Sequence, residues 1–357
     1  WATPAISHLE HLVDKREIRD TADSDGLITF EERTRERISR LDGIFGGLGL
    51  QPLIRANIRL KQHGRKETVE HQDNATHRLA AERSTRMPHP FDSGYVAEPF
   101  LTLCADYPEG DVYPSDQFRL EWGPIFHRGR LDGSARVLVI GQDPAQHETI
   151  VRRILVGEAG RRVQGLLAKI GITRSYVFLN TYVYSVYGSV KAKTRRDPSL
   201  IDYRNRWFEA LLVGGQVETV LALGQAADEA WEFWKATPAS QSVIVTYAPV
   251  MHPTQPESSS KGDKTLLSAA TKTLLQNWNV ALQALSPSVQ HPDVPTPLVL
   301  YGETWAEGDR VAIPEFDFPA GLPGWMHEQD GWTKRAGADN LAKRRNITLT
   351  VPKGIVA

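Results

Sequence analysis

The chain has 357 residues, of which 41% are hydrophobic and 24% are charged, and its formal net charge is −1. This length suits one large domain with additions or two domains, and the near-zero charge excludes a global basic field, so a nucleic-acid site must be a local patch. The single cysteine, Cys104, excludes a disulfide framework and an all-cysteine metal or iron–sulfur site. The sequence has no long apolar run and no signal-like segment, which predicts a cytoplasmic protein without membrane spans.

Residues 1–94 are predicted to form a mostly helical N-terminal extension. The stretches 5–20 and 30–45 have the spacing of amphipathic helices. Between them, Asp23, Asp25 and Glu32 occupy the third, fifth and twelfth positions of a calcium-binding loop whose sixth residue is a glycine. The first position is Thr21, where a carboxylate is needed, so a helix–turn–helix connection is favoured over calcium binding.

Residues 95–286 are predicted to form an α/β domain. Four apolar, β-branched runs at 135–140, 175–180, 218–224 and 242–249 suit strands that are buried on both faces. Helical patterns lie between them and after the last, at 161–171, 199–212, 226–236 and 264–285. This alternation predicts a parallel sheet covered by helices.

Residues 287–357 are predicted to form a small β-rich C-terminal appendage. The segment begins with a proline-rich stretch, and two short strand-like runs follow at 310–318 and 346–351.

Polar side chains follow three of the predicted strands. Asp143 comes after the first, Asn180 ends the second, and His252 follows the fourth. Ligands of open parallel sheets bind at the carboxyl ends of the strands, so these side chains are expected to share one cleft. Each by itself is weak evidence, because a single Asp often caps a helix and a single His beside Pro is commonly a loop residue.

Other classes of site are less well supported. The glycine-rich turns of nucleotide-binding proteins and the Gly-x-Ser-x-Gly elbow of serine hydrolases are missing. His8, His147 and His252 have no regular ligand spacing, so neither a metal site nor a cofactor is expected.

Three motifs carry a family resemblance: GQDP at 141–144, FLN at 178–180 and MHPT at 251–254. In this order they resemble the uracil-DNA glycosylase superfamily over about 95–285. The segment 156–188 is also similar to the bacterial members that carry an iron–sulfur cluster, which this chain with its one cysteine cannot hold. The resemblance implies a three-layer α/β/α sandwich around a parallel four-stranded sheet, and base excision from DNA as the activity.

The resemblance also implies roles for the residues at the strand ends. Asp143 would hold or activate the water that attacks the sugar, Asn180 would read the edge of the flipped base, and His252 would bind the base O2 with help from the backbone N–H of Gln142. Hydroxyl and basic side chains in two polar loops could bind DNA phosphates, although solvated loops are an equal alternative. These side chains are Lys191, Lys193, Arg195, Arg196, Ser258, Ser259 and Lys261.

The sequence departs from the family pattern around the base pocket. Ala145 stands where the familiar enzyme has a Tyr that blocks the 5-position of the base, and Leu155 stands where a Phe stacks on it. HPTQPES lacks the usual leucine wedge, and Asp197 replaces the His of members that bond covalently to DNA, so covalent capture is not expected.

Three functions remain open at this point. The favoured one is a monofunctional glycosylase for a bulky 5-modified cytosine, hydroxymethylated or glucosylated as in phage DNA, acting in antiviral defence. The second is a uracil-DNA glycosylase of base-excision repair, with Leu155 stacking on the base. The third is a non-catalytic reader of unusual bases, which has little need for the water-directing carboxylate of Asp143.

Overall fold

The computed structural model describes residues 97–108, 112–319, 322–328, 331–339, 342–343 and 346–351. The predicted N-terminal helices and the calcium-loop residues Asp23, Asp25 and Glu32 lie outside these ranges. The chain divides into two compact units, and the larger unit comprises Asp92–Phe318 and His327–Thr350. All the predicted catalytic, base-binding and phosphate-binding residues belong to this larger unit.

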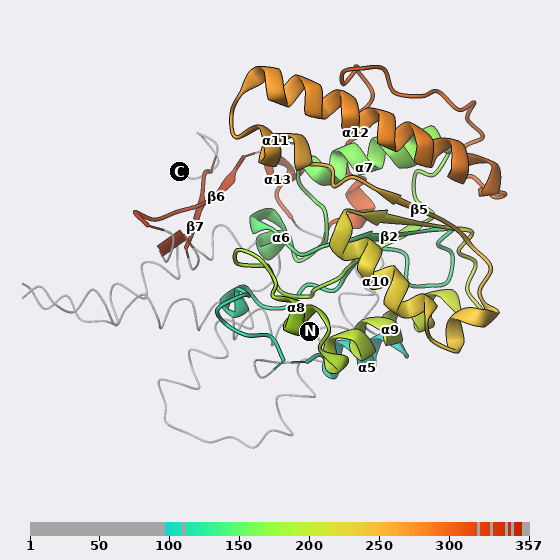
Figure 1. Cartoon of the computed structure of the whole chain (residues 1–357), viewed down its shortest axis with the longest axis horizontal. Helices are drawn as coiled ribbons and strands as arrows, with labels where there is room; N and C mark the ends of the chain where they lie inside the picture. Colours follow the sequence, from blue (N-terminus) through green and yellow to red (C-terminus); the bar gives the residue numbers. More distant parts are fainter. Residues whose placement is uncertain are drawn as a thin grey trace, which may run out of the picture. The chain divides into compact units, whose positions relative to one another are not determined.

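The larger unit is built on a five-stranded sheet in the order β1-β3-β2-β4-β5 (Figure 1). The four predicted strands are confirmed as a parallel set: β2 (Val137–Gly141), β3 (Tyr176–Asn180), β4 (Thr219–Leu223) and β5 (Thr246–Val250). The fifth, β1 (His127–Gly129), pairs antiparallel with β3. It was not predicted, because three residues with two polar side chains form no apolar run.

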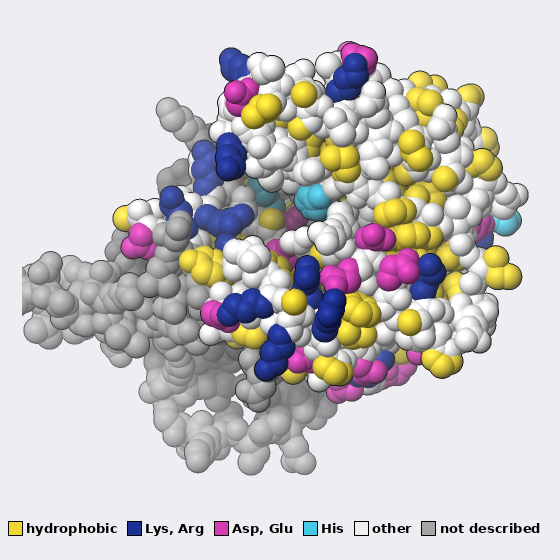
Figure 2. Space-filling view, in the orientation of Figure 1, with side chains coloured by type: hydrophobic (Ala, Val, Ile, Leu, Met, Phe, Trp, Pro, Cys, Tyr) yellow, Lys and Arg dark blue, Asp and Glu magenta, His cyan; other side chains and the backbone are white. Residues whose placement is uncertain are grey.

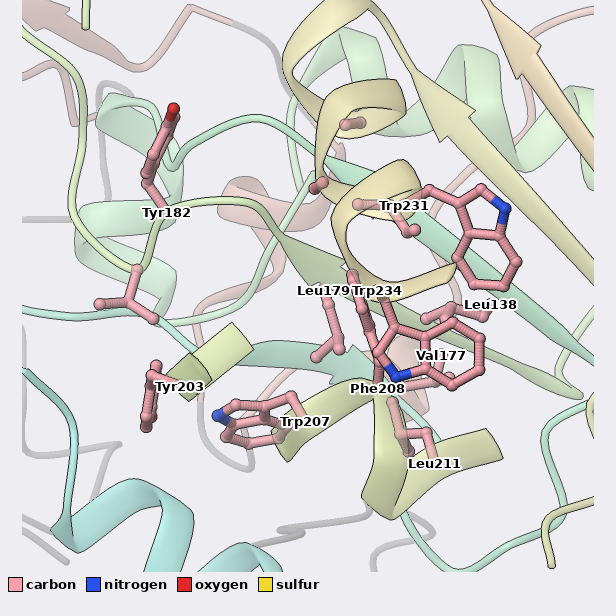
Figure 3. Packing of buried hydrophobic residues seen from close by; sticks show 14 of the residues in the cluster. Leu138, Val177, Leu179, Tyr182, Tyr203, Trp207, Phe208, Leu211, Trp231 and Trp234 are labelled. Atoms are coloured by element: carbon pink, nitrogen blue, oxygen red, sulfur yellow. The ribbon is translucent and has the colours of Figure 1, made fainter. Parts of the chain in front are cut away.

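Helices cover both faces of this sheet and complete the expected three-layer sandwich. All residues of β2, β3 and β4 are buried, which explains why their sequences are apolar apart from Asn180 and Thr219 at strand ends. On one face lie α7 (Glu158–Lys169) and α12 (Lys264–Leu285), and on the other α5 (Phe100–Ala105), α9 (Pro198–Leu212) and α10 (Gln225–Lys235). Each face of the sheet has its own hydrophobic core. Figure 3 shows the core beneath α5, α9 and α10, whose aromatic members include Tyr203, Trp207, Phe208, Trp231 and Trp234.

Shorter helices follow the carboxyl ends of three strands. They are α6 (Gln146–Val151) after β2, α8 (Ala192–Arg195) after β3 and α11 (Gln255–Ser260) after β5. The last two lie in stretches that were interpreted as loops. The described chain also contains the 3-10 helices η2 (Leu120–Trp122), η3 (Ala239–Ser242), η4 (Ser286–Ser288) and η5 (Glu315–Asp317). None of the helices in the described ranges is long and apolar enough to cross a bilayer.

A small antiparallel pair of strands, β6 (Thr333–Arg335) and β7 (Ile347–Leu349), follows α13 (Gly324–Glu328). The predicted C-terminal β element is thus confirmed, and β7 lies within the predicted run 346–351. The other predicted strand, 310–318, is wrong: it contains only the turn η5. Pro314 lacks the N–H that a strand ladder needs, and Asp317 is drawn inward by a buried ion pair with Arg128 at 2.5 Å.

Candidate active site

The predicted catalytic side chains lie at the carboxyl edge of the sheet. Gly141, the last residue of β2, pairs in register with Asn180, the last residue of β3, so Asp143 follows β2 beside the end of β3. His252 comes two residues after the end of β5. The space-filling view in Figure 2 shows a hollow with histidine side chains in it and Lys and Arg side chains around its rim.

Asp143 is a half-buried carboxylate held from two sides. Its Oδ2 accepts the Val186 N–H at 2.7 Å, and its Oδ1 accepts the Gln142 side-chain amide at 3.0 Å. Burial raises the pKa of Asp143 above its ordinary value, while these two donors and the nearby charges of Arg119 and Arg335 partly offset that effect. A carboxylate has about four acceptor sites, so both oxygens can still accept a further hydrogen bond, for example from water.

A buried arginine holds the backbone that binds Asp143. The Arg119 guanidinium donates to the Val186 carbonyl and to the Ser185 hydroxyl at 3.1 Å, and its side chain is 4% exposed. It lies over the rings of Trp122 and Tyr187. Sequence reasoning missed Arg119, because its partners are more than 60 residues away in the chain.

Asn180 is buried, and its side-chain amide presents an available donor. The Nδ2 atom is buried without a hydrogen-bond partner in the described part of the chain. A Cβ at position 141 would collide with the Asn180 Oδ1, so only glycine allows the carboxamide to lie across the end of β2. The same hypothetical Cβ would lie 3.8 Å from the Leu155 Cδ1 atom, which puts Leu155 beside Asn180 as expected for a base-pocket residue.

His252 is held as a neutral imidazole. Its Nδ1 accepts the Thr254 N–H at 3.3 Å, so the ring proton resides on Nε2. Burial lowers the pKa of His252 to about 4, which keeps this tautomer uncharged at neutral pH. Gly224, with φ +85°, leaves room beside it: a Cβ there would lie 3.3 Å from the His252 Cβ.

The loop that carries His252 is anchored by Arg162 of α7. The buried Arg162 guanidinium donates to the Pro253 carbonyl at 2.6 Å and pairs with Glu158 at 2.9 Å and Glu257 at 2.6 Å. A helix on one face of the sheet therefore sets the position of a loop at its edge. The sequence carries no signal for this contact, since 91 residues separate Arg162 from Pro253.

Glu148 ties together the two segments in which the sequence departs from the family pattern. Its carboxylate accepts the Ala145 N–H at 3.0 Å and the Val156 N–H at 3.2 Å. Ala145 is exposed at the start of α6, and Leu155 is buried with a left-handed φ of +51°. A glutamate three residues after a helix N-cap is half of a capping box, which is the signal that could have identified Glu148.

The proposed phosphate-binding residues differ in how they are engaged. Lys191 pairs with Asp116 at 2.6 Å and Arg195 with Glu229 at 3.7 Å, whereas Lys193 and Arg196 are exposed and form no ion pair with any described residue. The Ser258 and Ser259 hydroxyls of α11 donate to the Thr254 and Pro256 carbonyls at the start of this helix, and Lys261 is exposed just after it. Asp197 caps α9 by accepting the Ser199 N–H.

The comparison with protein families agrees with this geometry. Residues 128–278 match the family model described as the uracil DNA glycosylase superfamily, and this range contains all the candidate catalytic and base-binding residues. Residues 128–278 belong to the uracil-DNA glycosylase superfamily. Members of the uracil-DNA glycosylase superfamily act on DNA, and the resemblance first found in three short motifs is thereby confirmed. No curated protein matches the chain.

The neutral imidazole of His252 in this uracil-DNA glycosylase superfamily domain predicts a loss of stability in acid. The pKa of His252 is about 4 in the folded protein and about 6.5 when unfolded, so its contribution is complete above pH 6.5 and is lost as the pH falls towards 4. The expected loss between pH 7.5 and 4.5 is about 2–3 kcal/mol. Urea unfolding of the wild type and His252→Gln at both pH values measures it, and equal losses in the two proteins would contradict it.

Proposed function

We propose that this protein is a monofunctional DNA glycosylase that flips a pyrimidine out of DNA and hydrolyses its N-glycosidic bond. The observation that carries the proposal is that a half-buried carboxylate, Asp143, and a neutral imidazole, His252, both follow strands at the carboxyl edge of a uracil-DNA glycosylase superfamily sheet. A protein that only reads bases has no use for a desolvated carboxylate, whose burial costs stability.

Asp143 acts on the sugar side of the scissile bond. Its two oxygens, fixed by Val186 and Gln142, accept a hydrogen bond from a water molecule below C1′. As the C1′–N1 bond breaks, the sugar becomes an oxocarbenium ion that the carboxylate stabilises. The water oxygen then bonds to C1′, and its proton passes to Asp143, which leaves an abasic site.

His252 acts on the base side. The electron pair of the broken bond stays with the pyrimidine, and negative charge develops on its O2. The Nε2–H of the neutral imidazole donates to this oxygen, as an oxyanion-hole donor does. The Nδ1 bond from Thr254 is what directs the proton to Nε2. Asn180 supplies its unpartnered Nδ2–H to an acceptor on the edge of the flipped base.

The favoured substrate is a cytosine with a bulky 5-substituent, hydroxymethylated or glucosylated as in phage DNA, and its removal would serve antiviral defence. Ala145 is a small, exposed side chain where the family has an aromatic gate, and Leu155 offers no aromatic face for stacking. A larger base can recover the lost dispersion contacts by filling the space beside C5. Uracil is the second candidate, because Leu155 is buried beside Asn180, where a base would stack.

The phosphate-binding proposal predicts a graded effect of charge removal. Lys193→Ala with Arg196→Ala is expected to weaken binding to many DNA sequences alike and to lower the slope of log affinity against log salt by about 2. Lys191→Ala with Arg195→Ala is the matched control: these cations are already paired with Asp116 and Glu229, so the slope changes less. Equal slopes in the wild type and both double variants would show that the side chains of this segment do not bind DNA phosphates.

The substrate proposal is tested by direct competition. Oligonucleotides with uracil, hydroxymethylcytosine, glucosylated hydroxymethylcytosine or cytosine at one position are incubated with the protein, and alkali-labile strand breaks are measured. We expect breaks at the modified cytosines in preference to uracil. Efficient cleavage at uracil alone supports the repair function instead, and binding without breaks at any base supports a reader.

A further inference from the structure

The C-terminal β6–β7 ribbon, residues 333–335 and 347–349, packs against the helix that follows the catalytic carboxylate. The buried Trp332 meets His147 of α6 edge to face, with ring centroids 5.0 Å apart, and Thr333 is also buried. Only Pro144 and Ala145 separate Asp143 from the start of α6. The ribbon lies outside the range 128–278 that matches the family, yet it contacts α6 beside the catalytic carboxylate.

Strand β6 presents its two basic side chains to opposite sides. Successive side chains of a strand alternate, so Arg335 shares a face with the buried Thr333, and Lys334 points the other way. Arg335 is therefore on the face directed at the domain, although its side chain is exposed. Its charge acts on Asp143 and opposes the rise in the pKa of that carboxyl.

The Arg335 guanidinium forms no ion pair with any residue in the described ranges, Asp143 included, and Asp143 already receives hydrogen bonds from Val186 and Gln142. An exposed cation on a strand that contacts α6, with a charge that reaches Asp143, suits a negatively charged group that must approach this carboxylate. In DNA that group is a backbone phosphate, which a guanidinium can bind through two parallel N–H donors. Figure 2 shows further Lys and Arg side chains gathered on the same side of the hollow, over β6 and α6.

We propose that the β6–β7 ribbon is a DNA-binding element and that Arg335 binds a backbone phosphate of the strand entering the cleft beside Asp143. The inference rests on the proposed glycosylase function and extends the DNA-binding surface beyond the family domain. The ribbon supplies a cation that offsets the repulsion between phosphate and Asp143, and Lys334 on the opposite face takes no part.

The test measures binding of the full chain to an unmodified duplex and to a single strand over a range of salt concentrations, independently of base excision. Arg335→Ala is expected to weaken binding and to lower the slope of log affinity against log salt by about 1. Lys334→Ala, which removes the same charge from the same strand, is expected to leave the slope close to that of the wild type. Arg335→Lys, which keeps the charge, is expected to retain most of the slope.

The outcomes separate this inference from the proposed function. Equal slopes for Arg335→Ala, Lys334→Ala and the wild type, with normal excision, would overturn the ribbon proposal and leave the glycosylase intact. An acid-limb shift in the pH–rate profile of Arg335→Ala with unchanged DNA affinity would also overturn it, because Arg335 would then act on Asp143 alone. If the salt slope depends on Arg335 but the protein excises no base, the ribbon is a DNA-binding element and the proposed glycosylase function is wrong.

Discussion

Asp143→Asn is expected to lower the rate of base excision by about 10²–10⁴-fold while leaving DNA binding intact. The substituted side chain can neither take a proton from water nor stabilise positive charge on the sugar. Its carbonyl oxygen can still accept the Val186 N–H, and the Gln142 carboxamide can turn to present its own oxygen, so the local structure should persist. Single-turnover excision and DNA affinity, measured on the same protein, check both parts.

The control for this substitution is Asp202→Asn, which removes a carboxylate from the exposed surface of α9. It should excise at the wild-type rate. If Asp143→Asn excises as fast as Asp202→Asn, Asp143 has no part in the chemical step. If it loses DNA binding to the same extent as activity, the substitution has damaged the site rather than the reaction.

Ala145→Tyr is expected to abolish excision of a bulky 5-modified cytosine by filling the space beside C5. Ala145 is exposed and has extended backbone angles, φ −104° and ψ −170°, so a tyrosine fits there without strain. The Glu148 cap binds only the backbone N–H of residue 145, so the side chain can change without loss of that bond. Excision of glucosylated hydroxymethylcytosine and of uracil by the variant is the measurement.

Two further variants test whether the effect of Ala145→Tyr comes from the size and aromatic character of the side chain. Ala145→Ser adds only one hydroxyl group to the side chain and should keep activity on the bulky base. Ala145→Tyr combined with Leu155→Phe restores both an aromatic gate and a stacking face, so it should gain activity on uracil, since stacking contributes about 1–3 kcal/mol per base. Full activity of Ala145→Tyr on the bulky base would show that position 145 lies outside the pocket.

The architecture was predictable where local pattern and burial agree. The stretches 137–140 and 176–179 are apolar because helices cover both sheet faces, and that same burial makes the strands recognisable in the sequence. The pattern failed at β1, whose sequence is largely polar, and at 310–318, where Asp317 turns inward to pair with Arg128. Such an ion pair depends on where a distant residue lies, and no local periodicity records it.

The sequence by itself determined that Asp143, Asn180 and His252 lie at one edge of the molecule, because parallel strands with right-handed crossovers bring their carboxyl ends together. Only the tertiary structure decided what holds them there. Arg119 reaches Val186, and Arg162 reaches Pro253, from segments more than 60 residues away, and the ribbon packs against α6 at the same edge. The positions of the strands along the chain follow from short-range patterns, whereas such single hydrogen bonds and charges depend on how the completed layers pack.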